Sequence, residues 1–209
     1  MEAIKLLASD RTVERLGGIY ALERIMRDSL KDHLTVVEVL ASFIREHTRI
    51  ATDVEVAPQT NPHPTEHVQA ALTVLGRRPV VHEPFRIDLR GTDLRGADLK
   101  QARLDRIRLG GAQLDKSDLT EAQLEDAWLQ ETSLEGVWLD RAYLGQANLR
   151  AANLRDASLM DANLTNAKLF GTDLSTAQGC TAEQIEIAAI LDNATQLPPD
   201  IATRPASAE

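Results

Sequence analysis

The chain has 209 residues, of which 32 are acidic and 23 are basic, and its formal net charge is −9. This charge argues against general binding of nucleic acid, which requires a basic footprint. The single cysteine, Cys180, excludes an intrachain disulfide and indicates a reducing compartment. The N-terminus lacks a signal-peptide core, and no apolar run approaches the roughly 18 residues of a membrane span. We therefore expect a soluble cytoplasmic protein without membrane contact.

Residues 1–84 are predicted to form an α-helical N-terminal domain. Apolar residues recur at helical spacing in three segments, residues 11–28, 33–47 and 65–75. Gly17 and Gly18 interrupt the first segment, which indicates either a close approach of another helix or a break between two helices.

The third predicted helix has a candidate residue at each end. Thr65 is placed to cap its start, and Gly76 follows its last periodic residue. Three prolines before it, Pro58, Pro62 and Pro64, predict a loop.

The central stretch, residues 85–178, contains a leucine at every fifth position. The eighteen members of this series, which we name the leucine ladder, are Leu89, Leu94, Leu99, Leu104, Leu109, Leu114, Leu119, Leu124, Leu129, Leu134, Leu139, Leu144, Leu149, Leu154, Leu159, Leu164, Leu169 and Leu174. A small or β-branched residue lies two positions before each leucine, and it is alanine in eleven cases.

A period of five fits no straight element. It would rotate successive leucines by about 140° around an α-helix and would alternate their faces along a strand. A coiled coil also fails, because its apolar residues recur every 3.5 positions on average. The period does fit a chain that turns a corner in every repeat and sends the leucine and the small residue inward. Seven glycines at the corner positions agree with such tight turns, namely Gly91, Gly96, Gly110, Gly111, Gly136, Gly145 and Gly171.

The units GADLK, EAQLE, QANLR, AANLR, DASLM and DANLT resemble the A-(D/N)-L-x-x unit of pentapeptide repeat proteins. This resemblance implies an all-β solenoid, a right-handed quadrilateral β-helix with four repeats per coil and about 4.5 coils. The segments LGGIYALERI, EVLASFIRE and VQAALTVLGRR are similar to a helical region that precedes the repeats in many bacterial members. Because a solenoid needs capping elements, we expect this region to cover the first coil near Phe85 and Ile87. A separate partner-binding domain is the alternative, and the two roles are compatible.

Residues 179–209 are predicted to form a C-terminal capping helix and a tail. Thr181 and Gln184 have the spacing of a capping box, and the helix should seal the last coil. Pro198 and Pro199 should end any helix, and the final ATRPASAE is expected to be disordered. The alternative to a simple lid is a homodimer surface at this end, as in some relatives.

No catalytic motif or cofactor fingerprint is present. His63 and His67 are four residues apart, but the prolines around His63 keep it outside a helix, so solvated loop histidines are favoured over a metal site. Cys180 is expected to be a buried structural thiol. We therefore expect no enzyme activity, cofactor or metal.

The residues that point outward from the repeats provide the remaining evidence about function. Residues 113–140, here the acidic waist, hold eight acids and one base, whereas residues 85–112 and 141–178 have a small excess of bases. The candidate partner surface combines three aromatic residues with four acids of the waist, namely Trp128, Trp138, Tyr143, Asp118, Glu121, Glu125 and Asp126.

Two functions remain open. The lack of a catalytic motif and the regular surface of the repeats predict a non-catalytic interaction scaffold with an unknown protein partner. The resemblance implies an alternative, because some members mimic B-form DNA, bind DNA gyrase and protect it from quinolones. Mixed charge, a central residue that is always leucine and the absence of interrupting loops argue against that alternative.

Overall fold

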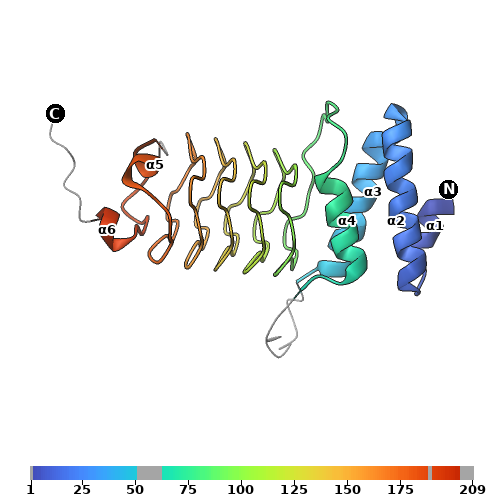
Figure 1. Cartoon of the computed structure of the whole chain (residues 1–209), viewed down its shortest axis with the longest axis horizontal. Helices are drawn as coiled ribbons and strands as arrows, with labels where there is room; N and C mark the ends of the chain where they lie inside the picture. The colour runs from blue at the N-terminus through green and yellow to red at the C-terminus, as the bar shows by residue number, and fades with distance from the viewer. Residues whose placement is uncertain (1, 51–62, 188–189, 203–209) are drawn as a thin grey trace.

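The computed structural model describes residues 2–50, 63–187 and 190–202. The four helices α1 to α4 lie together at one end, a column of coils extends from them, and α5 and α6 lie at the far end (Figure 1). The helices are α1 (Glu2–Leu7), α2 (Thr12–Asp28), α3 (Leu30–Thr48), α4 (Glu66–Gly76), α5 (Ala182–Ile187) and α6 (Pro199–Ala202). None of the helices in the described part of the chain is long and apolar enough to cross a membrane.

The N-terminal helical region is confirmed, with α2, α3 and α4 near the three predicted segments. Helix α1 was not predicted, because six residues are too few to display a periodicity. Helix α2 continues through Gly17 and Gly18. A Cβ on Gly18 would lie 2.8 Å from the carbonyl oxygen of Ala3, so this glycine permits the close approach of α1.

The predicted helix caps have different outcomes. Thr65 occupies the N-cap of α4, but the predicted side-chain cap is wrong because its Oγ1 lies 3.1 Å from Nε2 of His67. The capping box of α5 is confirmed, since the N–H of Gln184 donates to Thr181 Oγ1 and the N–H of Thr181 donates to Gln184 Oε1. Pro199 begins α6 and does not end a helix, which is compatible with the missing N–H of proline at a first helical position.

The repeats form a solenoid whose coils are joined by parallel bridges between residues twenty apart. Arg108, Trp128 and Asn148 are joined in this way, and the same offset recurs along the repeats. With one bridge residue in every five, the period of twenty gives four columns of bridges. The bridges are isolated single residues and not continuous strands. They do not delimit complete coils, so the predicted number of coils stays a prediction.

The interior of the solenoid contains all eighteen residues of the leucine ladder, none more than 3% exposed. The small residues two positions earlier are buried beside them. In the middle coils, the backbone of the outward residue between them is hydrogen-bonded to the coil before and to the coil after. For example, the N–H of Trp128 donates to the carbonyl oxygen of Ile107, and the N–H of Leu109 donates to that of Trp128, both at 2.8 Å.

The corners are turns with a left-handed residue at the second position after every leucine of the ladder except Leu174. In one such turn the N–H of Ala127 donates to Leu124 across 3.1 Å, and Asp126 has a φ of 53°. This is the geometry of a type II turn. Twelve non-glycine residues in the described repeats adopt positive φ at this position. Gly110 and Gly145 precede it and do not have positive φ, so glycine marks only part of the corners.

The helical region covers the first coil. The residues after α3 pair with it, because Arg49 forms an antiparallel bridge with Thr92 and the N–H of Ile50 donates to Gly91. Helix α4 ends against the coil, where a Cβ on Gly76 would lie 2.8 Å from the Cβ of Ala102. The expected loop at Pro58 and Pro62 lies outside the described residues.

A buried ionic cluster, here the junction clamp, consists of Arg78, Glu83 and His33. Arg78 binds the Glu83 carboxylate in a bidentate manner, with N–O distances of 2.7 and 3.1 Å, and also donates to the carbonyl oxygens of Leu75 and Arg103. His33 Nε2 lies 3.0 Å from Glu83 Oε1. The clamp therefore joins α3, the end of α4 and the first coil.

The opposite end of the solenoid is covered by residues 180–187 and 190–202. The Gln184 side chain donates to the carbonyl oxygens of Leu159 and Ala162. Ile190 and Gln196 add parallel bridges to Lys168 and Asp173, so the ladder continues beyond the last repeat. The predicted disorder of ATRPASAE lies almost entirely outside the described residues.

Candidate interaction surface

Three large apolar side chains are exposed around one corner of the solenoid. Trp138 is 50% exposed, Tyr143 is 49% exposed and Met160 is 57% exposed. Trp138 and Tyr143 occupy adjacent columns, and Met160 lies at the corner between those columns in the next coil, where its carbonyl oxygen accepts from the N–H of Arg141. We name these three residues the aromatic edge.

Trp128 does not belong to the aromatic edge, although the sequence grouped it with Trp138. The two residues are ten apart, and a coil has twenty residues, so they lie on opposite sides of the solenoid. The guanidinium groups of Arg86 and Arg108 lie 4.7 and 5.0 Å from the centroid of the Trp128 ring. These cation–π contacts explain how a tryptophan is accommodated at an outward position there.

Met160 was missed by the sequence reasoning. It follows Leu159 at a corner and looked like an ordinary repeat residue. The period of twenty could have found it, because it lies twenty residues after Asp140, between the two aromatic columns. The Asp140 carboxylate in turn accepts from the Met160 N–H across 3.1 Å, which fixes this corner.

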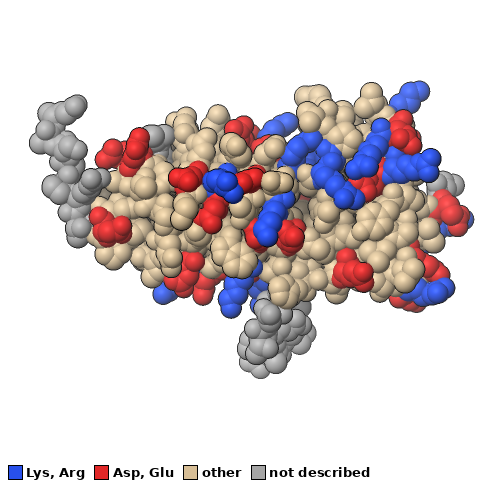
Figure 2. Space-filling model, in the orientation of Figure 1, with Lys and Arg blue, Asp and Glu red and all other residues tan. Residues whose placement is uncertain are grey.

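Bases from other coils pair with three of the eight acids of the acidic waist. Asp126 pairs with Arg86, Asp118 with Lys100 and Glu121 with Arg141. Glu125 forms no ion pair among the described residues. Figure 2 shows acidic and basic groups side by side on the face in view, so a continuous acidic stripe is not present there.

The pKa of Asp118 reflects this pairing. Burial opposes ionisation of its carboxylate, but hydrogen bonds from Thr120 and Lys100 outweigh burial and lower the pKa. The carboxylate is consequently held in its charged form as part of an ion pair. Three of the four acids proposed as a partner surface therefore have partners within the chain.

The structure places His63, His67 and Cys180 in three different surroundings. His67 is buried against Phe43 and His47, so the expected solvated position is wrong, and burial lowers its pKa. His63 lies 3.0 Å from the carbonyl oxygen of Gly96. Burial raises the pKa of the Cys180 thiol to about 11, which keeps it protonated at neutral pH. The part of the chain that the structure describes contains no cluster of three or more metal-ligating side chains.

Comparison with known proteins identifies the repeats. The family described as Pentapeptide repeats matches in eight copies, over residues 86–111, 97–136 and 139–175. No curated protein matches the chain. Pentapeptide repeat proteins fold as right-handed β-helices and are generally structural or interaction proteins. At that level the predicted fold class is confirmed.

Solved structures of pentapeptide repeat proteins are similar to part of the chain. One from Nostoc PCC 7120 is 31% identical, with 48% of this chain and 84% of that protein covered and a TM-score of 0.39. One from the Arabidopsis thaliana thylakoid lumen is 30% identical, with 40% and 61% covered and a TM-score of 0.35. QnrB1, a plasmid-mediated fluoroquinolone resistance protein, is 14% identical, with 52% and 64% covered and a TM-score of 0.29. At this identity and TM-score, the likeness to QnrB1 says nothing about the function of this chain.

Proposed function

Because the chain belongs to the pentapeptide repeat family, we propose that it is a non-catalytic scaffold that holds a partner protein against the aromatic edge. The observation that carries this proposal is the exposure of Trp138, Tyr143 and Met160 around one corner. Aromatic residues and methionine are enriched at protein interfaces, and exposed apolar clusters mark interaction sites.

The rigidity of the solenoid supports this role. The backbone around Trp138 and Tyr143 is bonded to the coils before and after it. Rigid aromatic anchors lose little conformational entropy when they bind, so a small edge of this kind contributes efficiently to affinity.

The test compares the double variant Trp138→Ala/Tyr143→Ala with the wild type in quantitative pulldown from the source cell. Loss of two hot-spot aromatic side chains should weaken the affinity for a specific partner by at least about 30-fold. Trp128→Ala is the matched control, because it removes a tryptophan from the opposite side. Unchanged recovery of every partner by the double variant, with circular dichroism showing an intact fold, would refute the proposal.

The acidic waist favours a second candidate, a DNA mimic that binds DNA gyrase and protects it from inhibitors. The ion pairs of Asp118, Glu121 and Asp126 reduce the negative potential that such a mimic needs. A supercoiling assay with a quinolone separates the two functions. A mimic at micromolar concentration should inhibit or protect gyrase, and neutralising these carboxylates and Glu125 should abolish the effect. Absence of any effect by the wild type would exclude the mimic.

A further inference from the structure

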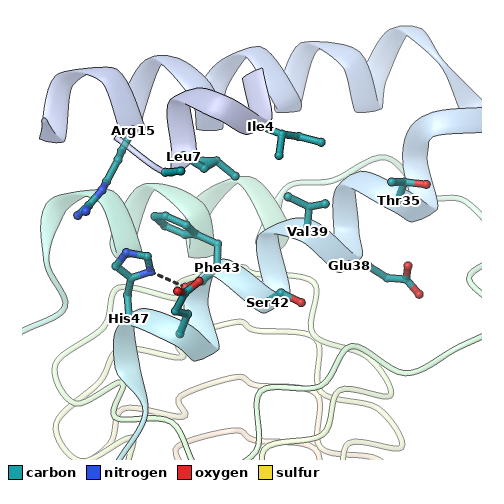
Figure 3. Close-up of a pocket in the computed structure, with 11 residues that line it drawn as sticks. Ile4, Leu7, Arg15, Thr35, Glu38, Val39, Ser42, Phe43 and His47 are labelled. Atoms are coloured by element: carbon teal, nitrogen blue, oxygen red, sulfur yellow. Dashed lines mark hydrogen bonds between the residues drawn. The ribbon is translucent and has the colours of Figure 1, made fainter. Parts of the chain in front are cut away.

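A groove lies between α1 and α3 in the helical region (Figure 3). Helix α1 packs mainly on α2 and makes little contact with α3 within the described chain, so the space between α1 and α3 stays open. The cavity measures about 520 Å³. This volume lies within the range of protein sites that bind ligands or side chains.

The groove has an apolar floor. Ile4 and Leu7 project from α1 toward Val39 and Phe43 of α3 (Figure 3). Leu7 and Phe43 are buried, Val39 is half-buried, and Ile4 is 46% exposed. An exposed isoleucine beside a half-buried valine leaves apolar surface that a partner could cover.

One rim of the groove is acidic. Glu38 and Glu46 are exposed and lie on α3, eight residues apart, which is about 12 Å along a helix. Neither carboxylate forms an ion pair within the described residues. Arg15, at the end of the groove, keeps its positive charge, because its Nε donates to the neutral carbonyl oxygen of Ser9 at 2.6 Å. Two carboxylates against one guanidinium still leave an excess of negative charge in the lining.

We propose that this groove binds an amphipathic helix of a partner protein, with its apolar stripe on the floor and its Lys or Arg side chains facing Glu38 and Glu46. The groove follows α3 from Thr35 to Glu46, which corresponds to about three helical turns. Apolar side chains spaced three and four residues apart match a groove of this form.

Other occupants fit less well. The walls are helices, so they offer no sheet edge for an added strand. An anionic membrane surface would meet the two carboxylates and be repelled. A second copy of the chain is the remaining competitor and is decided by the experiment.

The test uses the full chain and a fluorescein-labelled synthetic peptide of about 14 residues, built from leucine and lysine in a helical pattern. Its matched partner has glutamate in place of every lysine. Fluorescence anisotropy at physiological salt measures binding. The variant Glu38→Lys/Glu46→Lys should weaken the lysine peptide at least 10-fold and strengthen the glutamate peptide. The control Glu131→Lys/Glu183→Lys makes the same charge change at exposed acids elsewhere and should alter neither.

A second variant and a local readout complete the design. Ile4→Lys should also weaken binding of the lysine peptide. The methyl resonances of Ile4 and Val39 should shift when the wild-type protein is titrated with the lysine peptide. Equal weakening by the control variant would overturn the proposal, as would no binding by the wild type or shifts elsewhere only. Light scattering that shows a dimer lost in Glu38→Lys/Glu46→Lys would overturn it in favour of a second copy, and binding to phosphatidylglycerol vesicles by this face would overturn it in favour of a membrane.

Discussion

Removal of the Glu83 carboxylate is the sharpest test of how the helical region is attached to the solenoid. In Glu83→Ala, the guanidinium of Arg78 stays buried, and its Nε and Nη2 lose their acceptor. His33 Nε2, on a fully buried side chain, loses its partner as well. Only Arg78 Nη1 keeps its bonds, which go to the carbonyl oxygens of Leu75 and Arg103.

The expected cost follows from these lost contacts. A buried ion pair from which one member is removed is typically destabilised by about 3–5 kcal/mol, because the remaining charge is left uncompensated. The double variant Arg78→Met/Glu83→Leu removes both charges and should cost less, about 1–3 kcal/mol, for the carbonyl groups that lose a donor and for His33 Nε2, which loses its partner. Non-additivity of this size is diagnostic of a buried pair. The exposed pair of Asp88 and Arg90 serves as the control, and Arg90→Met should cost at most about 1 kcal/mol.

Two spectroscopic probes separate the halves of the molecule during urea unfolding. Both tryptophans, Trp128 and Trp138, lie in the solenoid, whereas the long helices lie in the N-terminal region. Far-ultraviolet circular dichroism therefore reports mainly on the helices, and tryptophan fluorescence reports on the coils. Glu83→Ala should lower the dichroism midpoint by about 2 M urea, given a slope of about 2 kcal/mol per M, and lower the fluorescence midpoint less. Additive single and double variants, or equal shifts of both midpoints, would refute the reasoning.

Three further predictions concern the response to acid, the corner residues and the leucine core. Burial opposes the ionisation of Glu83, but Arg78 and His33 outweigh burial and lower its pKa. The stabilisation by the Glu83 carboxylate is therefore complete above the ordinary pKa of about 4.3 and is lost as the pH falls through the lower folded-state pKa. Thermal melts followed by circular dichroism from pH 7 to pH 3 should show the helical region losing stability before the solenoid. Ala151→Gly should raise the free energy of unfolding by about 0.5–1 kcal/mol because Ala151 has a φ of 55°, whereas the same change at the buried Ala152 should lower it, and urea titrations compare them. Leu129→Ala should cost about 2–5 kcal/mol by fluorescence-monitored unfolding, and a cost below 1 kcal/mol would contradict an inward leucine.

The interior of the solenoid could be predicted because the same residue types recur at the same positions in every repeat. Eighteen leucines at one spacing leave a single consistent geometry, and the structure buries all of them. The corners were predicted only in part. Glycine signalled positive φ at Gly111 or Gly136, but Ala151 and Asp126 adopt it without any sequence signal, because the turn imposes that conformation.

The surface was less predictable because a five-residue period does not by itself say which outward residues share a side. The stacking of residues twenty apart separates Trp128 from Trp138 and brings Met160 beside Tyr143. Ion pairs such as that of Glu121 with Arg141 also follow from this period, since the two residues are twenty apart.

The junction clamp and the groove could not be predicted from the sequence. His33 and Glu83 are fifty residues apart, and no spacing relates them. The groove depends on α1, a helix too short to be recognised, and on how far α1 lies from α3. Such features arise when separately folded segments pack, and a pattern within one segment does not encode them.

The four-column geometry has a consequence for how this surface can change. Deletion or duplication of one five-residue unit before Trp138 keeps every leucine inside, but it moves all later residues by one column, a quarter turn around the axis. The aromatic edge would then point in a different direction relative to the groove between α1 and α3. A change of twenty residues would keep that direction and shift the edge along the axis by about 4.8 Å. Unequal recombination between repeats can thus change the direction of the aromatic edge relative to the groove in discrete steps while the leucine ladder stays buried.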